Sequence, residues 1–200
     1  MKRIIVGMTG ATGAVLGIEL LGQLQRRPDV ETHLVLSRWA RATIHLETEL
    51  SVRDVESLAN VVYSWDEQTA AISSGSFRVD GMVIAPCSMK TLAAIRMGYA
   101  DGLVARAADV TLKERRRLVL VARETPLSQI HLENMLALAR MGASIVPPMP
   151  AFYNHPASVG DMVDHIVTRI LDQFDIESST AKRWNGVSGA KASSLKVVND

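Results

Sequence analysis

The start of the chain carries the residue types of a phosphate-binding turn. The β-branched run at residues 4–6 leads into a glycine-rich segment with the hydroxyls of Thr9 and Thr12, and an apolar stretch at helical spacing follows. Glycine lets a backbone approach a phosphate closely, and a helix N-terminus offers free N–H groups with partial positive charge. We therefore predict a strand, a turn and a helix that bind phosphate. The alternative is a turn that only lets helix and strand pack closely. The glycines stand at positions 7, 10, 13 and 17.

The spacing of these glycines differs from the familiar nucleotide-binding fingerprints. It matches neither G-x-G-x-x-G nor a Walker A loop ending in Gly-Lys-Ser/Thr. A dinucleotide fold would also place an acidic residue about 20 positions further on, for the ribose hydroxyls. The second predicted strand, residues 31–36, is instead followed by Ser37 and Arg38. A hydroxyl and a cation suit a second phosphate contact better than a ribose.

Strand-like and helix-like segments alternate along the chain, as in a doubly wound, mainly parallel sheet. We predict one Rossmann-like α/β domain over residues 1–186 and a polar tail over 187–200. Pro86 is expected to end the third strand, and residues 63–72 fit no single element. The predicted strands are 4–6, 31–36, 81–85, 118–122 and 143–146, and the main helices begin near 15, 39, 89, 101, 127 and 158.

In such a sheet, ligands bind beyond the carboxyl ends of the strands. The residues that follow the predicted strands supply hydroxyls, backbone amides and an arginine, which suit a phosphorylated ligand. Taken alone, Ser88 and Thr91 are better explained as a helix N-cap and a first-turn polar residue than as ligand contacts. Cys87 fits a small buried hydrophobe better than a nucleophile. The candidates are Thr9, Gly10, Ala11, Thr12, Ser37, Ser88, Met89, Lys90, Thr91, Arg123, Glu124, Phe152 and Tyr153.

The composition excludes several classes of function. The net charge of +1, from 22 basic and 21 acidic residues, gives no general attraction for nucleic acid or an acidic membrane. The single cysteine fits a reducing compartment. The five histidines have no metal-ligand spacing, and no apolar run reaches the length of a membrane span. We expect a soluble cytoplasmic protein without a metal site.

Several further motifs resemble the UbiX/Pad-type flavin prenyltransferases, formerly described as aromatic acid decarboxylases. The resemblance runs in order from residue 3 to about residue 186 without large gaps, and the motifs are specific as a set. They are Met-Thr-Gly-Ala-Thr-Gly-Ala at 8–14, Leu-Glu-Thr at 46–48, Ile-Ala-Pro-Cys-Ser at 84–88, Arg-Ala-Ala-Asp-Val at 106–110, Leu-Lys-Glu-Arg-Arg at 112–116, Arg-Glu-Thr-Pro-Leu at 123–127, Ile-His-Leu-Glu-Asn-Met at 130–135, Pro-Ala-Phe-Tyr at 150–153, Arg-Ile-Leu-Asp at 169–172 and Arg-Trp at 183–184.

The resemblance implies a flavoprotein fold and a specific reaction. A dimethylallyl group would pass from dimethylallyl phosphate to N5 and C6 of reduced FMN, and the prenylated FMN would serve a UbiD-type decarboxylase. It also implies a homo-oligomer, a dodecamer, with sites between subunits. Two alternatives stay open at this point: a non-catalytic FMN-binding carrier subunit and an FMN-dependent decarboxylase.

The resemblance also assigns roles to residues. Glu47, Glu124 or the released phosphate would accept the proton lost from C6, and the sequence does not choose among them. Many members carry serine where this chain has Thr12. The implied catalytic residues are Glu47, Lys113, Glu124 and Thr12; FMN would contact Thr9, Gly10, Ala11, Thr12, Ser37, Ser88, Met89, Lys90, Thr91 and Arg123; dimethylallyl phosphate would contact Lys113, Arg123, Glu124, Tyr153 and Arg169, with Trp184 closing the pocket.

Overall fold

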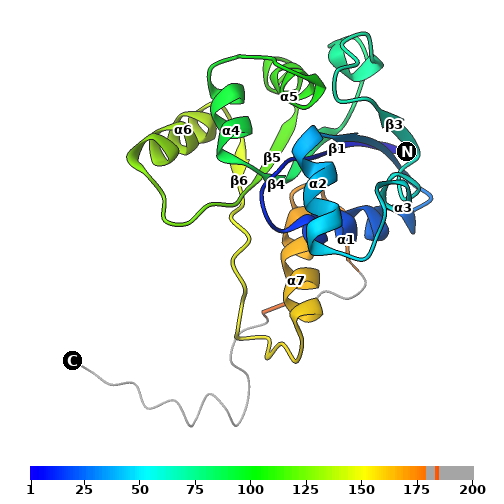
Figure 1. The fold of residues 1–200 in the computed structure, drawn as a ribbon, viewed down its shortest axis with the longest axis vertical. Helices are drawn as coiled ribbons and strands as arrows, with labels where there is room; N and C mark the ends of the chain where they lie inside the picture. The colour runs from blue at the N-terminus through cyan, green and yellow to red at the C-terminus, as the bar shows by residue number, and fades with distance from the viewer. Residues whose placement is uncertain (179–182, 185–200) are drawn as a thin grey trace.

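A six-stranded, all-parallel sheet forms the centre of the molecule (Figure 1). The computed structural model describes residues 1–178 and 183–184. The strand order is β3-β2-β1-β4-β5-β6, so the sheet grows outward in both directions from the β1–β4 pair. This confirms the predicted doubly wound α/β fold. The predicted tail at 187–200 lies outside the described residues. The strands are β1 (Lys2–Met8), β2 (Val30–Leu36), β3 (Val61–Tyr63), β4 (Gly81–Cys87), β5 (Arg117–Ala122) and β6 (Ser144–Ile145).

Helices cover both faces of the sheet because β1 is apolar on both sides. Ile4, Val6 and Met8 pack into one buried cluster, whereas Ile5 packs into the other. Successive side chains of a strand point to opposite faces, so a strand covered on both sides carries a continuous apolar run. The first cluster includes residues of α1 (Ala14–Gln25), α2 (Arg38–Glu47), α3 (Val52–Glu56) and α7 (Val159–Asp172), and the second those of α4 (Met89–Arg96), α5 (Leu103–Lys113) and α6 (Gln129–Arg140).

Serine side chains begin five of these helices by accepting an N–H from the first turn. Ser51 also forms a capping box with Asp54 at the start of α3. α1 is different because its N-cap is Gly13, which has no side chain to offer. The serine caps are Ser37, Ser51, Ser88, Ser128 and Ser158. None of the helices in the described residues has the length and apolar character needed to cross a bilayer.

One local prediction fails. The third strand does not stop at Pro86; β4 continues to Cys87 through a cis Ala85–Pro86 peptide, and its pairing with β5 shifts register between Ile84 and Cys87. Proline has no N–H for the ladder, so the pairing is interrupted there without ending the strand. The unassigned stretch 63–72 contains the end of the short edge strand β3 and the start of a 3-10 helix, Ala71–Ser73.

Gly17 sets how closely α1 lies on β4. A Cβ atom at this position would stand 2.4 Å from the carbonyl oxygen of Ala85 and 2.8 Å from the Met8 side chain. Gly22, on the same helix, has no neighbour nearer than Arg26 Nη1 at 4.0 Å. The two glycines therefore predict opposite effects of the same substitution.

We expect Gly17→Ala to lower the thermal unfolding midpoint sharply, because a buried backbone carbonyl cannot yield to a new methyl group. Gly22→Ala is the matched control and should raise stability by about 0.5–1 kcal/mol through helix propensity alone. Circular dichroism melts at one protein concentration measure both. Equal stability of Gly17→Ala and wild type would contradict this packing.

Candidate active site

The hydroxyl of Thr9 joins the carboxyl ends of β1 and β4. It donates to the carbonyl oxygen of Pro86 at 2.8 Å and accepts from the N–H of Ser88 at 2.8 Å. Thr9 is only 2% exposed, so this hydroxyl is used inside the protein. The hydroxyl therefore holds these two segments together.

A cavity of about 670 Å³ opens at this junction, at the point where the strand order reverses. Such a crevice is the usual ligand site of doubly wound folds. Six predicted residues line it: Thr9, Gly10, Ser37, Ser88, Lys90 and Thr91. The structure thus brings together residues that follow β1, β2 and β4.

Two helices begin at this cavity with serine caps. Ser37 accepts the N–H of Ala40 at 3.1 Å at the start of α2. Ser88 accepts the N–H of Thr91 at 3.4 Å and donates to its hydroxyl at 3.1 Å, at the start of α4. The N-cap interpretation of Ser88 is therefore correct. The first-turn N–H groups of both helices have no partner within their helices, so they offer an anion partial positive charge from two directions.

Aromatic residues that the sequence analysis missed form much of the remaining wall. Trp39 and Tyr99 line the cavity with 73% and 65% of their surfaces exposed. Trp65 also lines it, with the guanidinium of Arg38 at 3.8 Å from its ring centroid and its carbonyl accepting the N–H of Leu103 at 2.7 Å. Flat apolar surfaces beside two helix N-termini suit a planar ring system that carries a phosphate. The other missed wall residues are Ala94, Asp101, Gly102, Leu103, Val104 and Ala105.

Glu47 occupies the N-terminus of α1, where the sequence predicts a phosphate. Its Oε2 accepts the N–H groups of Gly13 at 2.9 Å and Ala14 at 2.8 Å. A carboxylate complements the partial positive charge there, and Gly13 has no side chain to cap the helix itself. The protein's own anion therefore takes the place expected for the phosphate at this helix, and α2 and α4 supply the open helix N-termini.

Arg123 lies at the same edge of the sheet, directly after β5. Its backbone N–H donates to the carbonyl of Cys87 at 3.1 Å, which joins the ends of β4 and β5. Its half-buried side chain makes no hydrogen bond or ion pair with any residue that the structure describes. Glu124 is exposed and accepts the N–H of Thr125 at 3.0 Å. Of the other candidates after β1 and β4, Ala11 is buried, Thr12 exposed and Met89 half-buried against the core.

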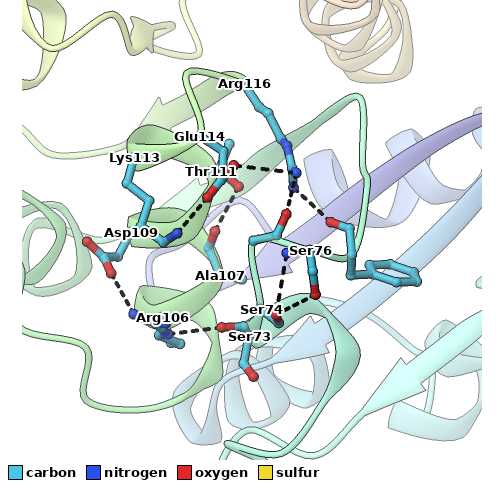
Figure 2. Close-up of polar contacts among 12 residues, drawn as sticks. Ser73, Ser74, Ser76, Arg106, Ala107, Asp109, Thr111, Lys113, Glu114 and Arg116 are labelled. Atoms are coloured by element: carbon cyan, nitrogen blue, oxygen red, sulfur yellow. Dashed lines mark hydrogen bonds and ion pairs between the residues drawn. The ribbon is translucent and has the colours of Figure 1, made fainter.

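Lys113 lies at the opposite end of β5. It ends α5 and precedes the first residue of that strand, and its Nζ donates to Glu114 Oε1 at 2.6 Å. Figure 2 shows this ion pair beside the 73–77 loop, which Arg106 and Arg116 hold through backbone carbonyls. The six residues of β5 therefore separate Lys113 from Arg123, by roughly 16–20 Å at about 3.3 Å per residue. One chain does not bring these two cations together.

Tyr153, Arg169 and Trp184 form a third group, beside α7. They line a cleft of about 370 Å³, in which the Tyr153 and Trp184 rings meet edge-to-face at 5.5 Å. The carbonyl oxygens of Phe174 and Gln173, just beyond α7, accept hydrogen bonds from Lys2 in β1 and Arg117 in β5. These contacts put the end of α7 at the amino edge of the sheet, away from the cavity.

The remaining candidate groups are inert or dispersed. Cys87 is fully buried, and burial raises the pKa of its thiol to about 12, as expected for a small buried hydrophobe rather than a nucleophile. Within residues 1–178 and 183–184, no three side chains of His, Cys, Asp or Glu come together as metal ligands do.

Comparison with known proteins identifies the family. A model of the flavoprotein family matches residues 1–171. A probable UbiX-like flavin prenyltransferase of Streptomyces sp. (strain D7) is 68% identical over 190 residues, 95% of this chain and 95% of that protein. This chain belongs to the UbiX-like flavin prenyltransferases. The resemblance seen in the sequence motifs is confirmed.

Solved structures of this family superpose closely on the chain. A dodecameric FMN-dependent UbiX-like decarboxylase from Escherichia coli O157:H7 is 66% identical, with a TM-score of 0.91 over 92% of this chain and 100% of that one. AnUbiX, crystallised with FMN and dimethylallyl pyrophosphate, is 58% identical, with a TM-score of 0.91 over 94% of this chain and 99% of that one. The fold described above is thus the fold of a flavin prenyltransferase.

The contacts of Glu47 predict a measurable contribution to stability. Glu47→Ala should cost about 1 kcal/mol, since it removes the acceptor for two N–H groups at the start of α1. Glu49→Ala is the control, because Glu49 is exposed and makes no hydrogen bond or ion pair within the part of the chain that the structure covers. Thermal melts compare the two variants. Indistinguishable midpoints would mean that Glu47 does not cap α1.

Proposed function

We propose that this chain transfers the dimethylallyl group of dimethylallyl phosphate to N5 and C6 of reduced FMN, which makes prenylated FMN. The observation that carries the proposal is the cavity between the ends of β1 and β4, in a chain 58% identical to a protein crystallised with FMN and dimethylallyl pyrophosphate. The names of the curated relatives favour prenyl transfer over the two alternatives, a non-catalytic carrier and an FMN-dependent decarboxylase.

The donor set of the cavity fits FMN. The N-termini of α2 and α4, with the hydroxyls of Ser37, Ser88 and Thr91, would bind the phosphate. The exposed rings of Trp39 and Tyr99 offer surfaces for a planar ring system. The side chain of Arg123, without a partner among the described residues, is a cation placed at the same edge. Gly10 and Ala11 belong to the same turn and would let the backbone approach the ligand.

The protein's contribution to the reaction is mainly electrostatic. Reduced FMN supplies the electron-rich N5 and C6 positions. When the allylic C–O bond breaks, its electrons leave with the phosphate, so Lys113, Arg123 and Arg169 would stabilise the departing group together with the Tyr153 hydroxyl. The ring of Trp184 would stabilise positive charge on the allylic carbon through its π face. Glu47, Glu124 or the departing phosphate would take the C6 proton, and the Thr12 hydroxyl lies in the same turn as the Glu47-capped helix start.

Assembly into a homo-oligomer would complete this site. Within one chain, Lys113 and the Tyr153–Arg169–Trp184 group lie apart from the cavity, so other copies must supply some of these residues. The E. coli relative is a dodecamer, and we propose the same assembly here. The nearly uncovered α6 supports an interface, because its apolar side chains are exposed and only Leu138 of that helix is buried. The exposed residues are Ile130, Leu132 and Leu136, with Met141 just beyond the helix.

The product implies a partner. Prenylated FMN is a cofactor, so a UbiD-type decarboxylase would receive it, and the transfer would take place in the cytoplasm. AnUbiX was crystallised with dimethylallyl pyrophosphate, whereas we propose dimethylallyl monophosphate as the substrate of this chain. Competition between the two donors in one reaction would rank them.

The proposed reaction has a direct test. Anaerobic incubation with chemically reduced FMN and dimethylallyl phosphate should yield a flavin heavier by one five-carbon prenyl unit in the mass spectrum. Excess EDTA should leave the yield unchanged, because cationic side chains are proposed to stabilise the phosphate. A reaction without donor and one with heat-inactivated protein are the controls. Unmodified flavin would reject the transferase and favour a carrier, and activity that EDTA abolishes and magnesium restores would reject the metal-free account.

A further inference from the structure

Asp172, the last residue of α7, joins two arginines. Its Oδ2 accepts from Arg169 Nη1 at 2.6 Å and from Arg183 Nη1 at 3.1 Å, while its Oδ1 accepts from Arg183 Nη2 at 2.6 Å. The side chain of Asp172 is 16% exposed, whereas those of Arg169 and Arg183 are 55% and 48% exposed. A single half-enclosed carboxylate therefore fixes two guanidinium groups that would otherwise move freely in water.

The contact with Arg183 is bidentate, with two N–H groups on two oxygens. This geometry fixes the orientation of the guanidinium as well as its position. The Arg183 guanidinium beside Asp172 also holds the pKa of that carboxyl below its ordinary value. The carboxyl of Asp172 is therefore ionised at neutral pH.

The net charge of the Asp172–Arg169–Arg183 cluster favours binding of an anion. One carboxylate between two guanidiniums leaves a net charge of +1, next to the cleft lined by Tyr153, His165 and Thr168 as well as the two arginines. Arg169 uses one of its five N–H donors on Asp172, so most of its fork still faces solvent and the cleft. Asp172 thus directs Arg169 without neutralising the site.

The same carboxylate reaches Trp184 through its neighbour in the chain. Arg183 precedes Trp184, and adjacent Cα atoms are about 3.8 Å apart, so holding the Arg183 side chain limits where the Trp184 Cα can lie. The Trp184 ring lies edge-to-face on Tyr153, whose other edge contact is with His165 on α7. Asp172 therefore stands at one end of a continuous set of contacts that borders the cleft.

We propose that Asp172 is a positioning residue: its carboxylate aims Arg169 at the phosphate of the prenyl donor and, through Arg183, keeps Trp184 over the same cleft. The inference rests on the proposed function for the identity of the donor. Stability alone does not explain the two ion pairs of Asp172, since pairs with arginines as exposed as these contribute little to folding.

Donor binding in the absence of turnover tests the proposal. The full chain loaded with oxidised FMN is titrated with dimethylallyl phosphate by calorimetry, so that no prenyl transfer takes place. Asp172→Asn keeps the shape of the side chain and removes its charge, and it should weaken donor binding at least about tenfold while the FMN dissociation constant changes less than about twofold. Asp175→Asn is the matched control, an 84% exposed acid three residues further on, and it should bind donor like wild type.

A double-mutant cycle tests the connection to Trp184. If Asp172 positions the ring, Trp184→Ala should weaken donor binding strongly in the wild-type background and only slightly in Asp172→Asn. Independent, multiplicative losses would overturn the connection. The positioning role would be overturned if donor binding were unchanged in Asp172→Asn or absent even from wild type. Loss of donor binding in Asp172→Asn together with FMN binding and thermal stability would overturn it as well. Wild-type protein that binds the donor through this cluster yet makes no prenylated flavin would reject the proposed function and leave the positioning role supported.

Discussion

The hydroxyl of Thr9 is the contact on which the proposed flavin cavity depends. It donates a hydrogen bond to the carbonyl oxygen of Pro86 and accepts one from the N–H of Ser88. Because Ser88 is the N-cap of α4, this buried threonine fixes where that helix begins relative to the turn after β1. The turn is fixed on its other side by Gly10, where a Cβ atom would come within 2.2 Å of the Trp39 Cβ. Two helix N-termini and one turn are thus held at a common edge.

The three cationic side chains proposed to bind the donor phosphate lie in separate places of one chain. Arg123 lies at the carboxyl edge of the sheet, Lys113 at the far end of β5, and Arg169 near the end of α7. Figure 1 shows α5 and α7 as separate elements on opposite sides of the sheet, and they pack into different core clusters. The proposed chemistry needs these cations around one phosphate, so we propose that assembly of several chains brings them to the cavity.

The sequence predicts the fold well because its signals are local. The buried strands are continuous apolar runs, and serine caps start helices close to the expected positions. β3 has only three residues at the edge of the sheet, too few for a periodic pattern, and its placement depends on pairing with β2. The cis peptide before Pro86 likewise depends on the tertiary structure rather than on a local motif.

The candidate site is predictable only in part. Residues that follow strands can be collected from the sequence, and six of them do line the cavity. Trp65 reaches it from a loop without a motif, and Asp101–Ala105 from the start of another helix, so neither has a signal in the strand pattern. Glu47 and Glu49 are indistinguishable in the sequence, yet only Glu47 meets the two N–H groups of α1. Contacts between distant segments decide these cases.

The most direct test of this account is the FMN affinity of Thr9→Val, measured by equilibrium titration of the flavin. Valine keeps the shape of threonine but leaves the Pro86 carbonyl and the Ser88 N–H without their partner, at about 1–3 kcal/mol for each unsatisfied group. Thr111→Val is the control, because that buried hydroxyl donates back to the Ala107 carbonyl within α5. Because α4 then loses the contact that fixes its start beside the cavity, we predict that Thr9→Val weakens FMN binding at least about tenfold, while Thr111→Val binds FMN like wild type. A folded Thr9→Val protein with wild-type FMN affinity would contradict the claim that this junction builds the flavin site.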